Sequence, residues 1–400
     1  MKKPKIRFKG FTETWEQRKL SELLVERNVQ HSQSEEFPLV SFTVENGVTP
    51  KTERYEREQL VRGDKSAKKY KETRLDDIVY NPANLKFGAI SRNKLGNAVF
   101  SPIYVTFEVK KDLVKPSFIE MVVKKKNFIQ KALQYQQGTV YERMAVNTED
   151  FTNLDVYIPN DLEQVKIGNY FENLDHLITL HQRKCENLKK LKKFMLQKLF
   201  PQNGENVPKI RFTNFTDTWE QRKLGDLTKE LSDYATMASG LPLLTSSRGG
   251  LMYQSYFRDR KTTTSDETLF SIVPKGSCTY RHMSDDDIFH FNINVLEKGL
   301  VSREYPVFIS SENNDLEFII QYINSSDRFR AFCKGQKKGG TRTRLYYKTL
   351  CEFEMMIPSI EEQKKISATL HKLDHLITLH QSKCDNLKEV KKYMLQNMFI

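Results

Sequence analysis

The sequence is poor in the residues that build disulfide frameworks and membrane spans. Only five cysteines occur among 400 residues, and they are scattered without a C-x-x-C pair. This pattern argues against both a disulfide framework and a cysteine-based zinc site. No stretch approaches 18 consecutive apolar residues, and no apolar segment follows the basic start at residues 1–5. We therefore expect neither a membrane span nor a secretory signal, and we expect a cytoplasmic location.

Motifs for catalysis and metal binding are also missing. The chain has no G-x-G-x-x-G and no Walker A sequence. Tyr80-Asn81-Pro82 resembles the start of the N-P-P-[YF] motif of adenine methyltransferases, but Ala83 and Asn84 replace its proline and aromatic residue. This segment is therefore interpreted as the boundary between a strand and a turn. No set of side chains can be assigned as a catalytic triad, so the sequence favours a binding protein over an enzyme.

Two clusters could suggest a metal site but have simpler interpretations. His371 and His375 are spaced i, i+4, yet no glutamate follows the first histidine, and the pair does not recur elsewhere in the chain. Asp285, Asp286 and Asp287 could attract a cation, but a solvated acidic turn is the better interpretation. We expect no metal ligands in this chain.

Charge and composition indicate a folded protein with a polyanionic partner. Apolar residues make up 38% of the chain, and 25 phenylalanines and 17 tyrosines are available for cores. The length predicts two to three domains. Sixty-four basic residues against 51 acidic ones give a net charge of +13. Such an excess favours a polyanionic partner, although a basic protein without a particular partner is the alternative.

The chain contains an internal repeat with constant ends and a variable middle. Residues 4–20 recur as residues 208–224 with 14 of 17 positions identical, and residues 158–200 recur as 357–399 with 26 of 43 identical. The segments between them share little sequence. We infer two half-molecules, each with a constant entry block, a variable body and a constant exit block. The constant blocks do one task twice, and the bodies do two different tasks.

Each exit block predicts a long helix. A proline ends the preceding extended segment, and Asn160 or Ser359 follows as a candidate N-cap. A glutamate lies three residues after each cap, at Glu163 and Glu362, which predicts a capping box at Ser359 and a near version of one at Asn160. About 40 residues of helix make a rod on the order of 60 Å long.

Apolar residues in both exit blocks recur every 3.5 residues, as in a coiled coil. The predicted seam positions are Ile167, Phe171, Leu174, Ile178, His181, Cys185, Leu188, Lys192, Met195 and Leu199, with Ile366, Leu370, Leu373, Ile377, His380, Cys384, Leu387, Lys391, Met394 and Met398 in the second copy. We expect the two helices to pair antiparallel, with one body at each end, and a parallel pair is the alternative. The polar members either reach out to solvent at the rim or fix the register.

Polar residues beside the seam are identical in the two copies although self-pairing does not require it. They are Asp175, His176, Thr179, Gln182, Asp374, His375, Thr378 and Gln381. We interpret them as a partner-binding surface presented twice, and residual identity without selection is the alternative.

The variable bodies predict mixed α/β folds with the same order of elements. Short strands are expected at 78–80, 89–90, 99–100 and 103–107, followed by a helix over 116–133. The second body predicts strands at 268–273, 291–295 and 307–309 and a helix near 315–324. A polar segment with glycine precedes the last strand of each body, and residues 326–348 contain eight basic residues and one acidic residue.

These features together resemble the specificity subunit of type I restriction-modification systems. The resemblance rests on the repeated P-K-I-R-F-x-x-F-T-x-T-W-E-Q-R-K-L block, the I-P-x-x-x-E-Q-x-K-I helix start and the L-D-x-x-I-x-L-H-Q coiled coil. It covers the whole chain in the expected order. Tyr80-Asn81-Pro82-Ala83-Asn84-Leu85 also resembles a segment frequent in the variable domains of this family.

The resemblance implies an α+β fold with pseudo-two-fold symmetry, in which two long helices form an antiparallel coiled coil between two target recognition domains. The expected boundaries are 1–157 and 204–356 for these domains, with helical spacers at 158–203 and 357–400. Each domain reads one half of a bipartite DNA site, and the helices set the spacing. The helices also dock two methyltransferase subunits, which bring restriction (translocase–nuclease) subunits with them. The chain itself is expected to be non-catalytic, with S-adenosylmethionine, ATP and Mg²⁺ on its partners.

The resemblance does not identify the residues that contact DNA, so they are chosen from side-chain chemistry. Arginine binds phosphate and guanine in bidentate geometry, and lysine binds phosphate. The candidates are Lys86, Arg92, Tyr141, Arg143, Arg248, Arg258, Arg281, Lys337, Lys338, Arg342 and Arg344. A coiled-coil architectural protein without sequence preference and a standalone methyltransferase are the alternative functions.

Overall fold

The computed structural model divides the chain into two compact units. The first comprises Met1–Gln182 and Ser382–Ile400, and the second comprises Arg183–Gln381. The structure describes residues 3–44, 46–50, 69–137, 145–202, 205–256, 267–337 and 341–400. Each unit therefore contains one variable body together with a segment of each long helix.

A two-stranded antiparallel sheet closes each body. In the first unit β1 (Glu16–Lys19) pairs with β11 (Asp155–Ile158), and in the second unit β12 (Glu220–Lys223) pairs with β24 (Glu354–Ile357). One strand of each pair comes from the constant entry block, and the other leads into the constant exit block. The chain therefore enters and leaves each body at the same place, whatever sequence lies between.

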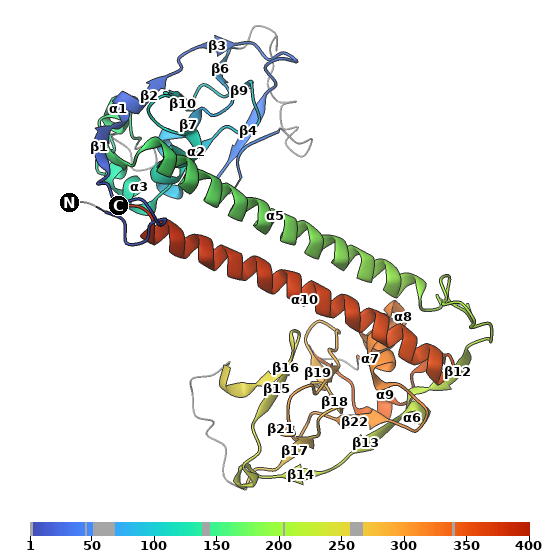
Figure 1. Cartoon of the computed structure of the whole chain (residues 1–400). Helices are drawn as coiled ribbons and strands as arrows, with labels where there is room; N and C mark the ends of the chain where they lie inside the picture. The colour runs from blue at the N-terminus through green and yellow to red at the C-terminus, as the bar shows by residue number, and fades with distance from the viewer. Residues whose placement is uncertain are drawn as a thin grey trace. The chain divides into compact units, whose positions relative to one another are not determined.

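The first body is built from small antiparallel sheets (blue to cyan in Figure 1). A four-stranded sheet has the order β2 (Leu24–Glu26), β10 (Val105–Val109), β7 (Ile78–Tyr80) and β8 (Ile90–Arg92). A three-stranded sheet has the order β3 (Gln30–His31), β6 (Tyr70–Thr73) and β9 (Ala98–Phe100), and β4 (Val40–Thr43) pairs with β5 (Gly47–Pro50). The helices are α1 (Leu20–Leu23), η4 (Pro82–Phe87), α2 (Pro116–Val123), α3 (Lys126–Leu133) and α4 (Thr148–Thr152).

The second body repeats this topology (yellow to orange in Figure 1). Its four-stranded sheet is β13 (Thr228–Leu231), β22 (Val307–Ser310), β18 (Cys278–Thr279) and β20 (Asn292–Ile293), and its three-stranded sheet is β14 (Tyr234–Ala235), β17 (Phe270–Val273) and β21 (Gly299–Ser302). Two further pairs are β15 (Leu244–Ser247) with β16 (Gly250–Tyr253), and β19 (Met283–Ser284) with β23 (Thr343–Arg344). The helices are α6 (Leu224–Leu227), η6 (Met237–Ser239), η7 (Gln254–Tyr256), α7 (Leu316–Ser325), α8 (Asp327–Gly335) and α9 (Tyr347–Leu350).

The strands expected from the sequence are present, with bounds shifted by a few residues, but the single helix expected over 116–133 is wrong. It is two helices, α2 and α3, separated at Lys125, whose backbone is extended with φ −62° and ψ 136°. The break carries the Lys125 ammonium to the Ile400 carbonyl oxygen at 3.0 Å and over the Phe399 ring. A tertiary contact therefore overrides a sequence that is locally compatible with one helix.

The predicted seam residues pack between α5 (Asp161–Lys198) and α10 (Ile360–Asn397). In the first unit the Phe171 ring packs against the Phe399 ring at a tilt, with 5.8 Å between ring centroids, and Asp175 binds Lys391. In the second unit the Cys185 thiol lies 3.9 Å from the Ile377 carbonyl oxygen, and Lys192 binds Asp374. In each unit, residues further along α5 contact residues nearer the start of α10. The two helices therefore run antiparallel within each unit, as expected.

The same aromatic cluster anchors the end of a helix in each unit. In the first unit the Trp15 ring lies 5.7 Å from Phe118 and 6.2 Å from Phe399, which follows α10. In the second unit the Trp219 ring lies 5.7 Å from Phe318 and 6.5 Å from Phe200, which follows α5. Both tryptophans are buried. Each body therefore holds the C-terminal end of one long helix by edge-to-face packing.

The entry block and the exit block of each unit are joined by a buried ion pair. Arg7 binds both carboxylate oxygens of Glu163 at 2.6 Å, and Arg211 binds those of Glu362 at 2.8 and 2.7 Å. The Asn160 side chain caps α5 by accepting from the Glu163 N–H at 3.0 Å. The predicted N-cap is thus confirmed, but the glutamate does not complete a capping box because its carboxylate is bound by arginine.

Candidate nucleic-acid interface

Basic residues of the second body gather around a turn formed by Asp285, Asp286 and Asp287, which is here called the acidic turn. Arg281 precedes β19, and Arg344 lies opposite Met283 in the β19–β23 pair. Arg342 stands just before β23, and Arg248 is in the turn between β15 and β16. The pairing of β19 with β23 therefore brings Arg281, Arg342 and Arg344 together, and ion pairs hold Arg248 and Lys337 beside the acidic turn.

Each carboxylate of the acidic turn binds a different cation. The Arg342 Nε lies 2.7 Å from the Asp285 Oδ1, and an Arg248 guanidinium nitrogen lies 2.5 Å from the Asp286 Oδ2. The Lys337 Nζ lies 3.8 Å from the Asp287 Oδ1. The interpretation of this turn as merely solvated was therefore incomplete, because it provides counter-charges for the predicted DNA-binding residues.

The acidic turn keeps its shape through contacts of its own. The Ser284 hydroxyl donates to the Asp286 carboxylate at 2.8 Å, and the Ile288 N–H donates to the same carboxylate at 3.3 Å. Asp287 has a φ of 60°, and its carboxylate accepts from the Thr343 hydroxyl. The Ser284 bond is the largest of the causes that lower the pKa of Asp286, so this carboxylate stays ionised at neutral pH.

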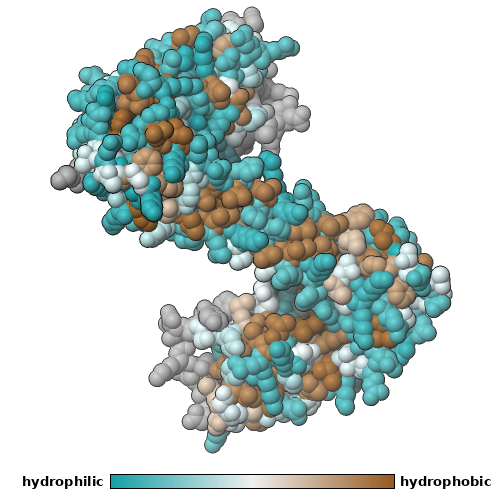
Figure 2. All heavy atoms as spheres, viewed as in Figure 1, coloured by the Kyte–Doolittle hydropathy of each residue, from teal (hydrophilic) through white to brown (hydrophobic). Residues whose placement is uncertain are grey.

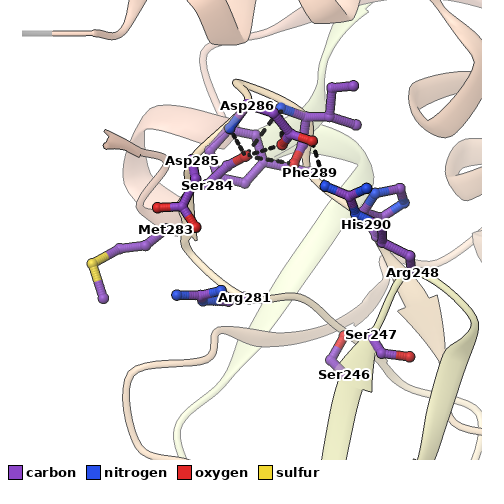
Figure 3. A pocket seen from close by; sticks show the side chains of 11 residues that line it. Ser246, Ser247, Arg248, Arg281, Met283, Ser284, Asp285, Asp286, Phe289 and His290 are labelled. Carbon is purple, nitrogen blue, oxygen red and sulfur yellow. Dashed lines mark hydrogen bonds and ion pairs between the residues drawn. The ribbon is translucent and has the colours of Figure 1, made fainter. Parts of the chain in front are cut away.

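A pocket of about 290 Å³ lies between the acidic turn and the β15–β16 hairpin. Figure 3 shows Arg248 reaching Asp286 across one end of it, with Ser246 and Ser247 on the hairpin side. Arg281, Met283, Phe289 and His290 also line it. The pocket thus combines hydroxyl groups, a guanidinium and an aromatic ring, all of which can contact DNA.

Two histidines near this pocket were not selected from the sequence. His290 lines the pocket, and burial, followed by the charge of Arg248, lowers its pKa. His282 is buried and stacks on Tyr346 with 5.4 Å between ring centroids, and burial is the main cause of its lowered pKa. Both therefore stay neutral at pH 7, so they do not add to the positive charge. No sequence motif distinguishes them from other histidines.

The first body presents Lys86 on the exposed side of η4. Its Nζ lies 5.1 Å from the centroid of the Phe87 ring, and both side chains are exposed. Asn81 caps this short helix by accepting from the N–H groups of Ala83 and Asn84. The interpretation of residues 80–84 as a strand-to-turn boundary is therefore confirmed, because β7 ends at Tyr80 and η4 begins at Pro82.

Arg92 has a structural role instead of a free guanidinium. Its side chain is 10% exposed, and it binds Asp76 at 3.1 Å, Glu120 at 3.2 Å and also Glu172 of α5. Three carboxylates therefore hold it within the first unit. The geometry gives no support to its selection as a DNA-binding residue. Four other selected residues, Tyr141, Arg143, Arg258 and Lys338, lie outside the described residues.

The predicted partner-binding residues divide into two groups. Asp175 binds Lys391 at 2.5 Å, and Asp374 binds Lys192 at 2.7 Å, so helix pairing itself accounts for their repetition. The same bonds favour the register-fixing role for the two lysines over the solvated rim. The remaining members are exposed on the helices: His176, Thr179, Gln182, His375, Thr378 and Gln381.

The helices also expose apolar side chains that the sequence reasoning missed. Figure 2 shows brown apolar surface along them. In the first unit the exposed residues include Leu177, Leu180, Val390 and Tyr393, and in the second unit they include Leu191, Phe194 and Leu379. Their signal in the sequence is a second apolar stripe, but the stronger seam pattern conceals it.

Among the described residues, no group of three or more histidine, cysteine, aspartate or glutamate side chains is placed to hold a metal ion. His371, which sequence spacing sets beside His375, binds the Glu317 carboxylate through Nδ1 at 2.7 Å. Within the same part of the chain, no helix is long and apolar enough to cross a membrane.

Comparison with known proteins agrees with this architecture. A family model described as the type I restriction modification DNA specificity domain matches residues 270–389. The chain is 22% identical over 304 residues to the MjaX type I restriction enzyme specificity subunit of Methanocaldococcus jannaschii, which covers 71% of this chain and 67% of the relative. Residues 270–389 therefore match a type I restriction-modification specificity domain, and most of the chain resembles a specificity subunit.

The fold of this chain is shared over its whole length with a solved structure. The crystal structure of a type I restriction-modification system S subunit from M. genitalium aligns with a TM-score of 0.64 and 12% identity, covering 100% of this chain and 99% of the other. At this identity the likeness establishes the fold alone.

Proposed function

We propose that each variable body reads one half of a bipartite DNA site, and that the two bodies read different sequences. The observation that carries this proposal is that both bodies have the same strand topology although their sequences share little. The constant blocks on either side of each body make the same contacts in both units. A common scaffold with different surface side chains suits two readers of the same kind of ligand. Phosphate contacts position such a reader, and base contacts give it specificity.

The helices act as the spacer between the half-sites and as the docking surface for two methyltransferase subunits. Support comes from the exposed polar residues that recur in both units (His176 with His375 and Thr179 with Thr378), together with the exposed apolar residues beside them. A surface presented twice suits two copies of one partner. Restriction subunits then join through the methyltransferase subunits.

We further propose that the chemistry takes place on these partners, in the cytoplasm. S-adenosylmethionine, ATP and Mg²⁺ bind the partner subunits, and this chain supplies none of the reacting groups. A direct check is an assay of the purified chain with DNA and S-adenosylmethionine. Methyl transfer without an added subunit would refute a non-catalytic role.

A segment exchange tests the division of labour between the two bodies. Residues 228–353 are replaced by the corresponding segment of a related subunit, which leaves β12, α6 and β24 in place. The variant is expressed with its methyltransferase subunit, and methylated bases are mapped by single-molecule sequencing. We expect one half of the methylated sequence to change and the other half to persist.

The matched control exchanges the segment between β1 and β11 in the same way. It is expected to change the opposite half of the site. If either exchange altered both halves, or neither exchange altered any half, the assignment of one half-site to each body would be wrong. Equal binding of specific and random duplexes at fixed salt would instead indicate an architectural DNA-binding protein.

A further inference from the structure

The cations around the acidic turn are bound by carboxylates but remain accessible. The side chains of Arg248, Arg342 and Lys337 are 76%, 54% and 39% exposed, respectively. Ion pairs at this exposure contribute little to stability, because water competes for both partners. These cations are therefore free to exchange one anion for another at little cost to the fold.

Arg92 of the first body shows the opposite arrangement. Its side chain is 10% exposed, and one of its partners, Glu120, is buried. Removing Arg92 from these carboxylates would take one of three cations from the buried Glu120, which Lys94 and Lys124 also bind, and loss of a partner by a buried charge is unfavourable. The contrast shows that the ion pairs at the acidic turn are not needed to hold the fold together.

The acidic turn places its carboxylates where DNA phosphates would bind the same cations. A carboxylate and a phosphate both bind guanidinium through charge-assisted hydrogen bonds, and both bind ammonium as a point charge. The bonds from Ser284 and Ile288 hold Asp286 in place independently of Arg248. The carboxylates therefore stay near the cations after an exchange and continue to repel phosphate.

We propose that the acidic turn is an internal competitor of DNA phosphate for Arg248, Arg342 and Lys337. This inference rests on the proposed function, because it assigns a regulatory role to part of the same DNA-binding surface. A duplex must displace the carboxylates before it gains these cations. The acidic turn thereby weakens binding to random DNA, which offers phosphates but few base contacts to compensate.

The test is the affinity of the full-length chain for a random duplex, measured by fluorescence anisotropy at 50 and 200 mM salt. The variant is Asp285→Asn, because Asp285 is exposed and its described contact is with Arg342. We expect roughly three- to tenfold tighter binding at 50 mM salt and a smaller gain at 200 mM, where screening weakens both attraction and repulsion. Thermal unfolding should be unchanged.

The matched control is Asp226→Asn, which makes the same charge change at an exposed aspartate of α6. Asp226 is paired with Arg222 of β12. This control should change the affinity less than twofold. Arg342→Gln should weaken binding by itself. Adding Asp285→Asn to it should give a smaller gain than in the wild-type background, because the cation that Asp285 occupies is gone and only the repulsion between Asp285 and phosphate is removed.

Three outcomes would overturn the inference while leaving the proposed function intact. They are unchanged or weaker binding by Asp285→Asn, an equal gain in Asp226→Asn, and a gain that is undiminished in the Arg342→Gln background. A wild-type chain that binds no duplex at 50 mM salt would refute the proposed function itself. The two kinds of failure are therefore separated by the wild-type measurement.

Discussion

The buried pair of Arg211 and Glu362 predicts a large and specific loss of stability when only the arginine is removed. The Glu362 side chain is 1% exposed, and both of its oxygens are bound by the Arg211 guanidinium. In Arg211→Met the carboxylate keeps its burial but loses its counter-charge. The hydrogen bond to Glu362 is also the largest cause of the raised pKa of Arg211, which favours the charged form of the guanidinium.

The expected loss is about 3–5 kcal/mol, the usual cost of leaving one member of a buried ion pair unpaired. For a unit of about 200 residues, each kcal/mol lowers the midpoint of thermal unfolding by about 2–4 °C. The transition of the second unit should therefore fall by roughly 6–20 °C. Arg211→Met with Glu362→Gln removes both charges and should recover a large part of this loss, because a neutral amide costs less to bury than a carboxylate.

Differential scanning calorimetry of the full chain can follow this loss. Arg7→Met is the matched substitution in the first unit, where Glu163 is fully buried. A loss under about 1 kcal/mol would refute the role assigned to this pair.

Two further predictions concern the other ion pairs. Asp374→Lys places two ammonium groups together and should lower the free energy of unfolding, measured in urea, by about 1–2 kcal/mol. Adding Lys192→Asp reverses the ion pair and should restore most of this free energy. If stability did not recover in the double variant, the pair would not fix the register of the helices. Arg92→Met should lower the melting temperature by several degrees, because it removes one partner of the buried Glu120. Lys86→Gln should leave the melting temperature unchanged and reduce the salt dependence of DNA binding by about one phosphate contact. A DNA-binding defect without a stability loss in Arg92→Met, or a stability loss without a binding defect in Lys86→Gln, would contradict the roles assigned to these residues.

The long helices were predictable because their signal is local and repeated. A seam with a period of 3.5 residues places Phe171 and Leu370 on one face of each helix whatever the partner is. The sequence favoured antiparallel pairing of the two helices but left parallel pairing as an alternative. The pairing of Asp175 with Lys391 could not be read from either helix alone, since it depends on the register between them, which the packing of Phe171 against Phe399 fixes at one end.

The candidate interface was predictable in composition but not in arrangement. Glycine and basic residues near Arg342 indicated a phosphate-binding loop, and the structure places Arg342 beside the other cations. Its contact with Asp285 spans 57 residues and depends on the pairing of β19 with β23. Strands of two residues carry too little pattern to predict such a pair. The ion pairs of Arg92 were unpredictable for the same reason, because its three carboxylates come from distant segments.

The contacts shared by the two units explain why the constant blocks tolerate divergent bodies between them. Arg7 with Glu163 and Trp15 with Phe399 join residues of constant blocks to one another, and the second unit repeats both contacts. A body needs to supply only an aromatic side chain such as Phe118 and strands of the right order. The side chains that would face DNA are then free to differ, because neither the closing sheet nor the helix anchor depends on them. The fold therefore separates the residues that hold a reader in place from those that determine what it reads.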